Sequence, residues 1–460
     1  MNALKTKLEN RQATAAVIGL GYVGLPLAME IAAAGFQVIG IDLDRNKINT
    51  LKQGKSYIQD VPDKTVADAV RNGKFTPTAD FSALAGADTV SICVPTPLSK
   101  SRDPDISFIL SATEEIRKYL HAGQLIVLES TTYPGTTDEL IVPELETTGL
   151  KVGSDFFVAF SPERIDPGNA SYNTHNTPKI VGGITTECTE IARLFYSAFI
   201  ERVIPVSSTK CAEMVKLLEN TFRSVNIGMV NELAMMCDLL GVDVYEVIDA
   251  AATKPFGFSA FYPGPGLGGH CIPIDPHYLA WKLKALNFQA RFIGLAAEIN
   301  GMMPAVVATM VADGLNRASK SIRGSKIMIL GVAYKKDVSD CRESPALDVM
   351  RLLGDKGALL SYNDPMVPTL RLGGSVLNSV EASPAEIAKH DCVIILTDHS
   401  VYDVEEIVAA SKLVIDTRNS TKHLHSYKDR IIKLGAGNKV PSSSAHDDEH
   451  DLPPIRASAR

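Results

Sequence analysis

The chain has 460 residues, more than one ordinary hydrophobic core accommodates, so two or three domains are expected. Hydrophobic residues make up 45% and charged residues 22%, the composition of a globular protein. The net charge of −7 argues against a nucleic-acid partner.

Cysteine usage and the N-terminus bear on the cellular compartment. The seven cysteines are scattered without paired spacing, which argues against a disulfide framework and a zinc cluster and suits a reducing cytoplasm. No metal is therefore expected. Residues 1–11 are polar and charged, unlike a signal peptide, and no apolar run approaches the roughly 18 residues that span a bilayer. We expect a cytoplasmic protein with no membrane partner.

A glycine-rich turn follows the first predicted strand. Residues 14–18 are typical of a buried strand and residues 25–34 of a helix, and the turn between them reads Gly19, Leu20, Gly21, Tyr22, Val23 and Gly24. Strand, glycine turn and helix in this order are the context of a dinucleotide site. Gly19 would make the tight turn, Gly21 would admit the pyrophosphate, and Gly24 would let helix and strand pack closely. A glycine-rich turn of another α/β protein is the alternative.

The second predicted strand, residues 37–41, ends in Asp42. This acid lies 18 residues beyond Gly24, about where a carboxylate binds both ribose hydroxyls. An aspartate there favours NAD over NADP because it repels a 2′-phosphate. Arg45 lies close enough to leave that preference open.

Polar residues follow three further predicted strands, residues 89–94, 125–128 and 157–160. Ligands of doubly wound sheets bind beyond the carboxyl ends of strands, so these residues should face one crevice. Taken singly, each is more often a turn or capping residue. They are Thr96, Thr131 and Glu163.

The middle of the chain is predicted to be helical. A long helix over residues 209–240 places Lys216 and Asn220 on one face, although a solvated lysine with an incidental neighbour fits as well. Helices over 242–252 and 280–316 follow, the latter broken near Gly301 and Pro304. These helices form a spine whose apolar faces are candidates for a dimer interface.

A loop at residues 261–276 interrupts the spine with four glycines and four prolines. No regular helix or strand tolerates that mixture, so a shaped loop is expected. It displays Cys271 four residues before Asp275. Cys271 is either a buried thiol that packs as a small hydrophobe or a nucleophile that forms a covalent intermediate.

The α/β pattern resumes with predicted strands at 326–330, 359–362, 392–396 and 413–415. This segment resembles a second nucleotide-binding fold whose first turn lacks the full glycine fingerprint. Lys335 and Arg342 near that turn would suit a diphosphate. The fold class is therefore α/β, with two Rossmann-like doubly wound domains joined by a helical domain. The expected segments are 1–208, 209–318, 319–436 and a disordered tail at 437–460.

From about residue 10 to 435 the chain resembles the UDP-glucose/GDP-mannose dehydrogenase family. The matching motifs occur in the family's order: the turn at 19–26, Val-Pro-Thr-Pro at 94–97, Ser-Thr at 130–131, Ser-Pro-Glu at 161–163, the helix at 213–220, the Gly-Gly-His-Cys loop, and the segments 331–335 and 342–345. The loop resembles most closely the branch that acts on UDP-N-acetylglucosamine in bacterial surface-polysaccharide pathways, such as those of O-antigen and capsule. Enzymes for UDP-N-acetylmannosamine tend to have Ala-Val where this chain has Pro273 and Ile274, and UDP-glucose remains a further alternative.

Two departures from the family are visible. Where UDP-glucose enzymes place an arginine that reaches the neighbouring subunit, this chain has residues 253–256, so either Lys254 substitutes for the arginine or the contact is absent. The turn at 130–136 has its proline displaced by one position.

The resemblance implies oxidation of a sugar C6 alcohol to a carboxylate with two NAD in succession. Cys271 would trap the aldehyde as a thiohemiacetal, which becomes a thioester, and Lys216, Asn220, Asp275, Glu163 and Thr131 would assist. The substrate is expected to contact Glu163, Arg164, Lys216, Asn220, Lys254, Phe261, Gly268, Lys335 and Arg342. The NAD contacts expected are Gly19, Gly21, Tyr22, Val23, Gly24, Asp42, Arg45, Pro95, Thr96 and Thr131.

Three questions stay open. His270 could lower the pKa of Cys271 or make a structural hydrogen bond. A non-catalytic sensor of nucleotide sugar and NAD would not need Cys271, Lys216 or Asp275, and all three are present. A two-electron β-hydroxyacid dehydrogenase would not need the cysteine loop or the second α/β domain. The central helices predict at least a homodimer.

Overall fold

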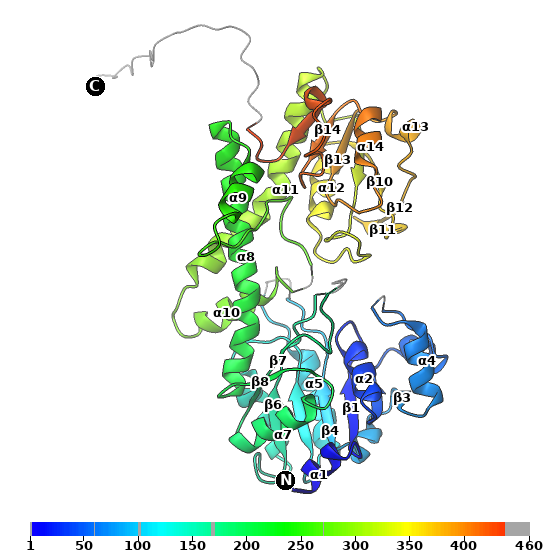
Figure 1. Ribbon diagram of the computed structural model, residues 1–460, viewed down its shortest axis with the longest axis vertical. Coiled ribbons are helices and arrows are strands. Elements are labelled where there is room, and N and C mark those ends of the chain that lie inside the picture. Colours follow the sequence, from blue (N-terminus) through cyan, green and yellow to red (C-terminus); the bar gives the residue numbers. More distant parts are fainter. Residues whose placement is uncertain (1, 59, 100–102, 167–170, 270, 438–460) are drawn as a thin grey trace, which may run out of the picture.

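The computed structural model describes residues 2–58, 60–99, 103–166, 171–269 and 271–437. Figure 1 shows two α/β units joined by long helices, with the N-terminal unit at the bottom and the C-terminal unit at the upper right. The predicted fold class is confirmed. His270 and the predicted tail beyond residue 437 lie outside the described residues.

The N-terminal unit is built on an eight-stranded sheet of order β3-β2-β1-β4-β5-β6-β7-β8. All neighbours are parallel except β6 and β7, which pair antiparallel. Most of these strands are almost wholly buried because helices cover both faces, which explains their continuous apolar runs. The strands are β1 (Thr14–Ile18), β2 (Gln37–Ile41), β3 (Phe75–Thr78), β4 (Thr89–Ile92), β5 (Leu125–Leu128), β6 (Phe157–Phe160), β7 (Lys179–Gly183) and β8 (Val203–Pro205).

The helices of this unit are α1 (Asn2–Glu9), α2 (Gly24–Ala33), α3 (Arg45–Lys52), α4 (Asp63–Arg71), α5 (Ser107–Tyr119), α6 (Val142–Glu146) and α7 (Thr186–Tyr196). Short helical turns lie at Phe81–Gly86 and Thr137–Ile141. The predicted strand–turn–helix at the start of the chain is thus confirmed.

The central helices are α8 (Thr209–Leu240), α9 (Val244–Ala252), α10 (Asp275–Lys284) and α11 (Arg291–Arg317). α8 begins on the N-terminal unit and extends beside α11 toward the C-terminal unit (Figure 1). The expected break near Gly301 and Pro304 is wrong, because α11 is continuous through both residues. Packing against α8 outweighs the hydrogen bond that Pro304 cannot donate, and the chain turns instead between α10 and α11, where Asn287 has a φ of 56°.

Among the described residues, only α11 has the length and composition of a membrane span, across an 18-residue window of the helix. The expectation that no apolar run approaches that length is therefore wrong for this helix. However, 44% of the window is buried inside the protein, and α11 packs against α8 and α12 (Pro345–Asp355). These contacts cover part of the apolar surface of α11.

The C-terminal unit has a parallel sheet of order β10-β9-β13-β14-β15 and a separate antiparallel pair, β11 with β12. The strands are β9 (Lys326–Leu330), β10 (Leu359–Asn363), β11 (Thr369–Leu372), β12 (Ser375–Asn378), β13 (Cys392–Ile395), β14 (Val414–Asp416) and β15 (Ile431–Lys433). The helices besides α12 are α13 (Pro384–Ile387) and α14 (Val404–Ala410), with a short turn at Lys428–Arg430.

The turn after the first strand of each sheet contains a glycine with a positive φ. Gly19 after β1 has a φ of 89° and Gly331 after β9 a φ of 79°. A Cβ at Gly19 would lie 2.5 Å from the Cys93 carbonyl oxygen, and one at Gly331 would lie 2.4 Å from Cβ of Thr397. Both positions therefore require glycine, and the second fold keeps the tight turn of the first.

Candidate active site

The loop that carries Cys271 is fixed at both ends. At its start the Gly264 N–H donates to Oδ1 of Asn231 at 2.9 Å, and Asn231 in turn donates to Asn300 of α11 at 2.8 Å. At its end the Cys271 carbonyl accepts from the N–H of Asp275, the first residue of α10, at 2.8 Å. Cys271 therefore lies one turn before α10, held by buried polar contacts from two long helices.

Gly268 shows how closely the loop approaches the C-terminal unit. A Cβ at this position would lie 2.8 Å from Cδ of Pro345, 2.9 Å from Cβ of Tyr334 and 3.1 Å from the Glu343 carbonyl oxygen. Glycine is required here by contact. The loop consequently lies at the junction of the central helices and the C-terminal unit.

Lys216 and Asn220 lie on the face of α8 that meets this loop, and both are buried. Nδ2 of Asn220 donates to Oδ2 of Asp275, which is 3% exposed. Nζ of Lys216 donates to the backbone carbonyl of Glu163 at 2.5 Å. The structure thus brings residues from α8, α10 and the turn after β6 to one place.

Asp275 and Cys271 have raised pKa values that leave them in different protonation states near neutral pH. Burial raises the pKa of Cys271 to about 11, with Asp275 adding to the shift and Lys216, Arg342 and Arg223 opposing it. Burial also raises the pKa of Asp275 to about 6, opposed by Lys216 and by the hydrogen bond from Asn220. Near neutral pH a carboxylate and a thiol therefore coexist, so Asp275 is suited to accept a proton.

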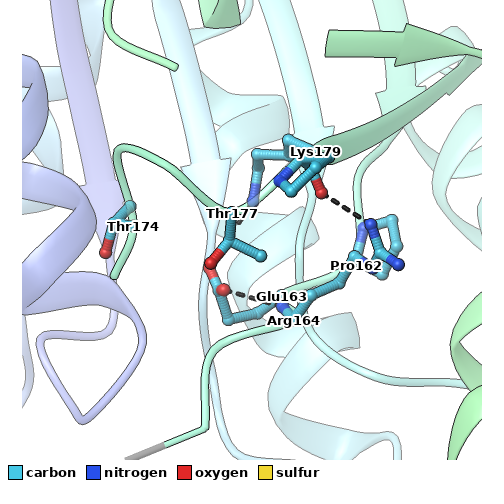
Figure 2. Close-up of a pocket in the computed structure, with 7 residues that line it drawn as sticks. Pro162, Glu163, Arg164, Thr174, Thr177 and Lys179 are labelled. Atoms are coloured by element: carbon cyan, nitrogen blue, oxygen red, sulfur yellow. Dashed lines mark hydrogen bonds and ion pairs between the residues drawn. The ribbon is translucent and has the colours of Figure 1, made fainter. Parts of the chain in front are cut away.

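The carboxylate of Glu163 is engaged within its own turn. Its Oε1 accepts from the N–H groups of Arg164 at 2.7 Å and Ile165 at 2.9 Å, and its Oε2 lies 3.5 Å from Nζ of Lys179. Figure 2 shows Glu163 and Arg164 beside Lys179, around a small pocket that Thr177 also lines. In this arrangement the backbone carbonyl, not the carboxylate, contacts Lys216.

The glycine turn after β1 leaves an open cradle. A Cβ at Gly24 would lie 1.8 Å from the Gly19 carbonyl oxygen, whereas a Cβ at Gly21 would meet nothing within 4 Å. Asp42 accepts from the Leu20 N–H at 2.9 Å. Lys47 pairs with Asp42 at 3.2 Å, while Arg45 at the start of α3 is exposed.

Thr96 and Thr131 follow the ends of β4 and β5, as predicted. Thr96 is buried, and its carbonyl accepts from the Tyr278 hydroxyl at 2.9 Å. Thr131 is partly exposed and Pro95 is exposed. β4 lies beside β1 and β5 lies beside β4, all three parallel, so these residues share the carboxyl edge of the sheet with the glycine turn.

Two cations of the C-terminal unit reach the N-terminal unit. The guanidinium of Arg342 lies over the Tyr22 ring, 5.1 Å from its centroid, and also bonds Asp340. Nζ of Lys335 pairs with Asp166 at 2.8 Å.

Two predicted substrate residues contact aromatic rings of the central segment. Lys254 is exposed and lies over the ring of Phe256, and Phe261 packs edge-on against Phe222 with centroids 5.7 Å apart. Among the described residues of one chain, the Lys254 ammonium makes no ion pair with the Cys271 loop. Among the described residues, no group of three or more His, Cys, Asp or Glu could hold a metal ion.

Comparison with known proteins decides the family. Three models of the UDP-glucose/GDP-mannose dehydrogenase family match in succession: the NAD binding domain at residues 13–200, the central domain at 210–302 and the UDP binding domain at 328–423. The chain belongs to the UDP-glucose/GDP-mannose dehydrogenase family.

Relatives within this family match over most of their length. A UDP-N-acetyl-D-mannosamine dehydrogenase of Methanococcus maripaludis is 36% identical, covering 88% of this chain and 93% of the relative. An NDP-N-acetyl-D-galactosaminuronic acid dehydrogenase of Ralstonia nicotianae is 35% identical, covering 88% and 95%. The solved structure of a UDP-D-ManNAc dehydrogenase from Pyrococcus horikoshii superposes with a TM-score of 0.84 at 33% identity, covering 93% of this chain and all of that one.

As a member of this dehydrogenase family, the protein uses NAD. The cradle above fits that cofactor, because the space beside Gly21 admits a pyrophosphate and a helix N-terminus follows it. Asp42 follows the end of β2, the position at which the sequence predicts a ribose contact.

Sequence reasoning missed three residues near this dehydrogenase's candidate site. Arg223 lies seven residues after Lys216 on α8, so helical spacing could have found it. Tyr334 touches the loop at Gly269, where a Cβ would lie 3.0 Å from the ring. Lys179 begins the buried strand β7, and a charge at that position was a signal in itself.

Proposed function

We propose that the protein oxidises the C6 alcohol of a UDP-N-acetylhexosamine to the uronic acid in two NAD-dependent steps. The observation that supports this most is the grouping of Cys271, Lys216, Asn220 and Asp275 at the junction between the cofactor unit and the C-terminal unit. A two-electron dehydrogenase has no need of a thiol there.

Each residue has a role that its chemistry allows. NAD supplies the hydride acceptor in both steps. Asp275, with a pKa near 6, takes the proton from the C6 hydroxyl or from the Cys271 thiol. The Cys271 sulfur adds to the aldehyde and retains it as a thiohemiacetal, and the thioester formed in the second step is hydrolysed by water. Lys216 and Asn220 stabilise the oxyanion.

Four further residues predicted from the sequence have auxiliary roles in this proposal. Thr131 and the Glu163 carboxylate assist hydrolysis. Arg164 helps to shape the sugar pocket, since its guanidinium bonds the Pro178 carbonyl at 2.6 Å and Glu219 of α8 at 2.6 Å. Lys335 holds the diphosphate.

The loop sequence and the named relatives favour different sugars as the substrate. Pro273 and Ile274 in the cysteine loop favour UDP-N-acetylglucosamine, the first candidate. The names of relatives favour UDP-N-acetylmannosamine, the second candidate. Either product would serve surface-polysaccharide biosynthesis in the cytoplasm, where seven cysteines without disulfide bonds persist as thiols.

We also propose a homodimer formed through the central helices. Apolar side chains that are 46–60% exposed recur along one face of α8 at Leu218, Phe222, Met229 and Met236. A contiguous exposed apolar face of this length is typical of a protein interface. In the dimer Lys254 would reach the neighbouring sugar site.

The test is the number of NADH released per sugar, with UDP-N-acetylglucosamine, UDP-N-acetylmannosamine and UDP-glucose offered separately. Two NADH from an N-acetylated sugar, lost in Cys271→Ala, is the expected result. Two NADH from UDP-glucose alone would move the substrate and keep the mechanism. One NADH per sugar, or full activity without Cys271, would overturn the proposal, and binding without turnover would favour a sensor.

A further inference from the structure

A buried charge cluster lies behind the turn that carries Glu163. Lys179 at the start of β7 is 5% exposed, and its Nζ lies 2.8 Å from Oε2 of Glu129, whose side chain is fully buried. The Tyr196 hydroxyl donates to the other oxygen of Glu129 at 2.7 Å. Burial opposes the charge on Lys179, yet Glu129 and Glu163 together hold its pKa above the ordinary lysine value.

Lys179 has a second carboxylate partner, Glu163, at 3.5 Å. One lysine therefore joins a wholly buried acid to an acid at the edge of the crevice, whose side chain is 13% exposed. A structural ion pair would need only Glu129. The contact with Glu163 is the part that folding alone does not explain.

The turn of Glu163 is interlocked with the segment that leads into β7. The Arg164 guanidinium donates to the carbonyl of Pro178, which precedes Lys179 (Figure 2). Nζ of Lys179 in turn lies 3.5 Å from Oε2 of Glu163. Arg164 also pairs with Glu219 of α8 at 2.6 Å. The turn is thus held from β7 and from α8 at once.

The turn that carries Glu163 also contacts Lys216 of α8. The Glu163 carboxylate accepts the N–H groups of the next two residues, which fixes the backbone of the turn, and the Glu163 carbonyl accepts from Nζ of Lys216 at 2.5 Å. The contacts therefore run from Glu129 through Lys179 and Glu163 to Lys216.

We propose that Lys179 is a positioning residue that sets the location of the Lys216 ammonium by holding the turn at Glu163. This inference rests on the proposed function in one respect, the catalytic role of Lys216. Lys179 itself lies behind the turn and acts through Glu163.

The experiment separates this role from simple charge balance. Lys179→Met leaves Glu129 buried without its cation, which destabilises the fold. The double variant Lys179→Met/Glu129→Gln removes both charges with similar shapes, so its thermal midpoint should return close to that of the wild type. Because Glu163 still lacks its partner in the double variant, kcat should stay at least tenfold below wild type, with KM for NAD within about twofold.

A second readout does not depend on turnover. The rate at which acetic anhydride acylates Lys216, measured by peptide mass spectrometry, should rise at least threefold in the double variant, because the ammonium is no longer held against the Glu163 carbonyl. Lys64, an exposed lysine of α4, serves as the internal control, with an unchanged rate. Recovery of kcat and of the Lys216 acylation rate to wild-type values would overturn the inference. If wild type itself releases no NADH with any UDP-sugar, the proposed function fails, while the acylation rate still decides whether Lys179 positions Lys216.

Discussion

The guanidinium of Arg342 lies over the ring of Tyr22, with 5.1 Å between Cζ and the ring centroid. Tyr22 belongs to the glycine turn of the cofactor unit, and Arg342 to the loop after β9 in the C-terminal unit. The sequence predicted Arg342 for the diphosphate of the substrate. From its position against the turn we infer a second role at the cofactor, with one cation serving both ligands at the junction of the two units.

Arg342→Gln should therefore weaken the binding of both NAD and the UDP-sugar. Loss of a charge-assisted contact costs about 1.5 kcal/mol, so KM for NAD and KM for the UDP-sugar should each rise about tenfold. Arg351→Gln is the matched control, since Arg351 is an exposed arginine of α12 that pairs with Asp348. An unchanged KM for NAD would show that Arg342 contributes to binding of the UDP-sugar alone.

Two glycines of the first turn should separate folding from cofactor binding. Gly24→Ala places a Cβ against the Gly19 carbonyl and should lower the free energy of unfolding by at least about 2 kcal/mol. Gly21→Ala meets nothing within 4 Å, so the free energy of unfolding should stay within about 0.5 kcal/mol of wild type. Calorimetric titration of Gly21→Ala should nevertheless show NAD binding at least tenfold weaker. Wild-type affinity in this variant would place the pyrophosphate elsewhere.

The sequence predicted what depends on neighbours along the chain. The strand–turn–helix at Gly19 to Gly24 follows from local pattern, and the shared face of Lys216 and Asn220 follows from helical spacing. Both features are present in the structure.

What the sequence missed depends on partners far away in the chain. Lys179 meets Glu129 across 50 residues, and no local pattern pairs them. Pro304 was expected to break α11, but contact along α8 keeps the helix continuous. Lys47 rather than Arg45 pairs with Asp42, because α3 begins at Arg45 and turns Lys47 toward the strand end.

Asp275 should give the protein a stability that falls as pH rises. Its pKa is raised from 3.8 to about 6, so the folded state binds the proton more tightly than the unfolded state. The neutral form is favoured on folding, and stability is lost between about pH 4 and pH 6 as the carboxylate ionises. Asp275→Asn should therefore be more stable than wild type by roughly 2–3 kcal/mol above pH 6.5, and by much less near pH 4.

Urea unfolding of both proteins at several pH values measures this difference. The same substitution should lower kcat about a hundredfold, and wild-type kcat should fall as pH drops through about 6. A stability difference that does not change with pH would show that Asp275 is not held at the raised pKa.

His399 should fix the loop that carries Lys335 and Arg342. Its Nε2 donates to Asp364 at 3.1 Å, and its Nδ1 accepts from the Asp337 N–H at 3.0 Å. Asp364 also accepts from the N–H groups of Val332 and Ala333 at 2.8 and 3.0 Å. This acid ends β10 as Asp42 ends β2, but it is buried under His399 and unsuited to a ribose.

His399→Ala should loosen that loop and weaken UDP binding three- to tenfold, measured by calorimetry without NAD. His390→Ala is the control, because this buried histidine of the same unit contacts Ser361 and the Glu386 carbonyl instead. Equal loss of affinity in both variants would mean that the unit as a whole, rather than the loop, had been disturbed.

The exposed face of α8 should hold two subunits together. Met229 is 54% exposed and Met236 is 46% exposed, two turns apart on the face that also carries Leu218 and Phe222. Two glutamates buried at an interface would lose their hydration without gaining partners, so Met229→Glu/Met236→Glu should convert the dimer to a monomer of 49.5 kDa in sedimentation. Leu359→Glu makes the same kind of change at a 57% exposed leucine of β10 and should leave the mass unchanged. If Lys254 serves the neighbouring site, the monomer should also have a lower kcat/KM for the UDP-sugar and an unchanged affinity for NAD. A fully active monomer would show that the site is formed by one chain alone.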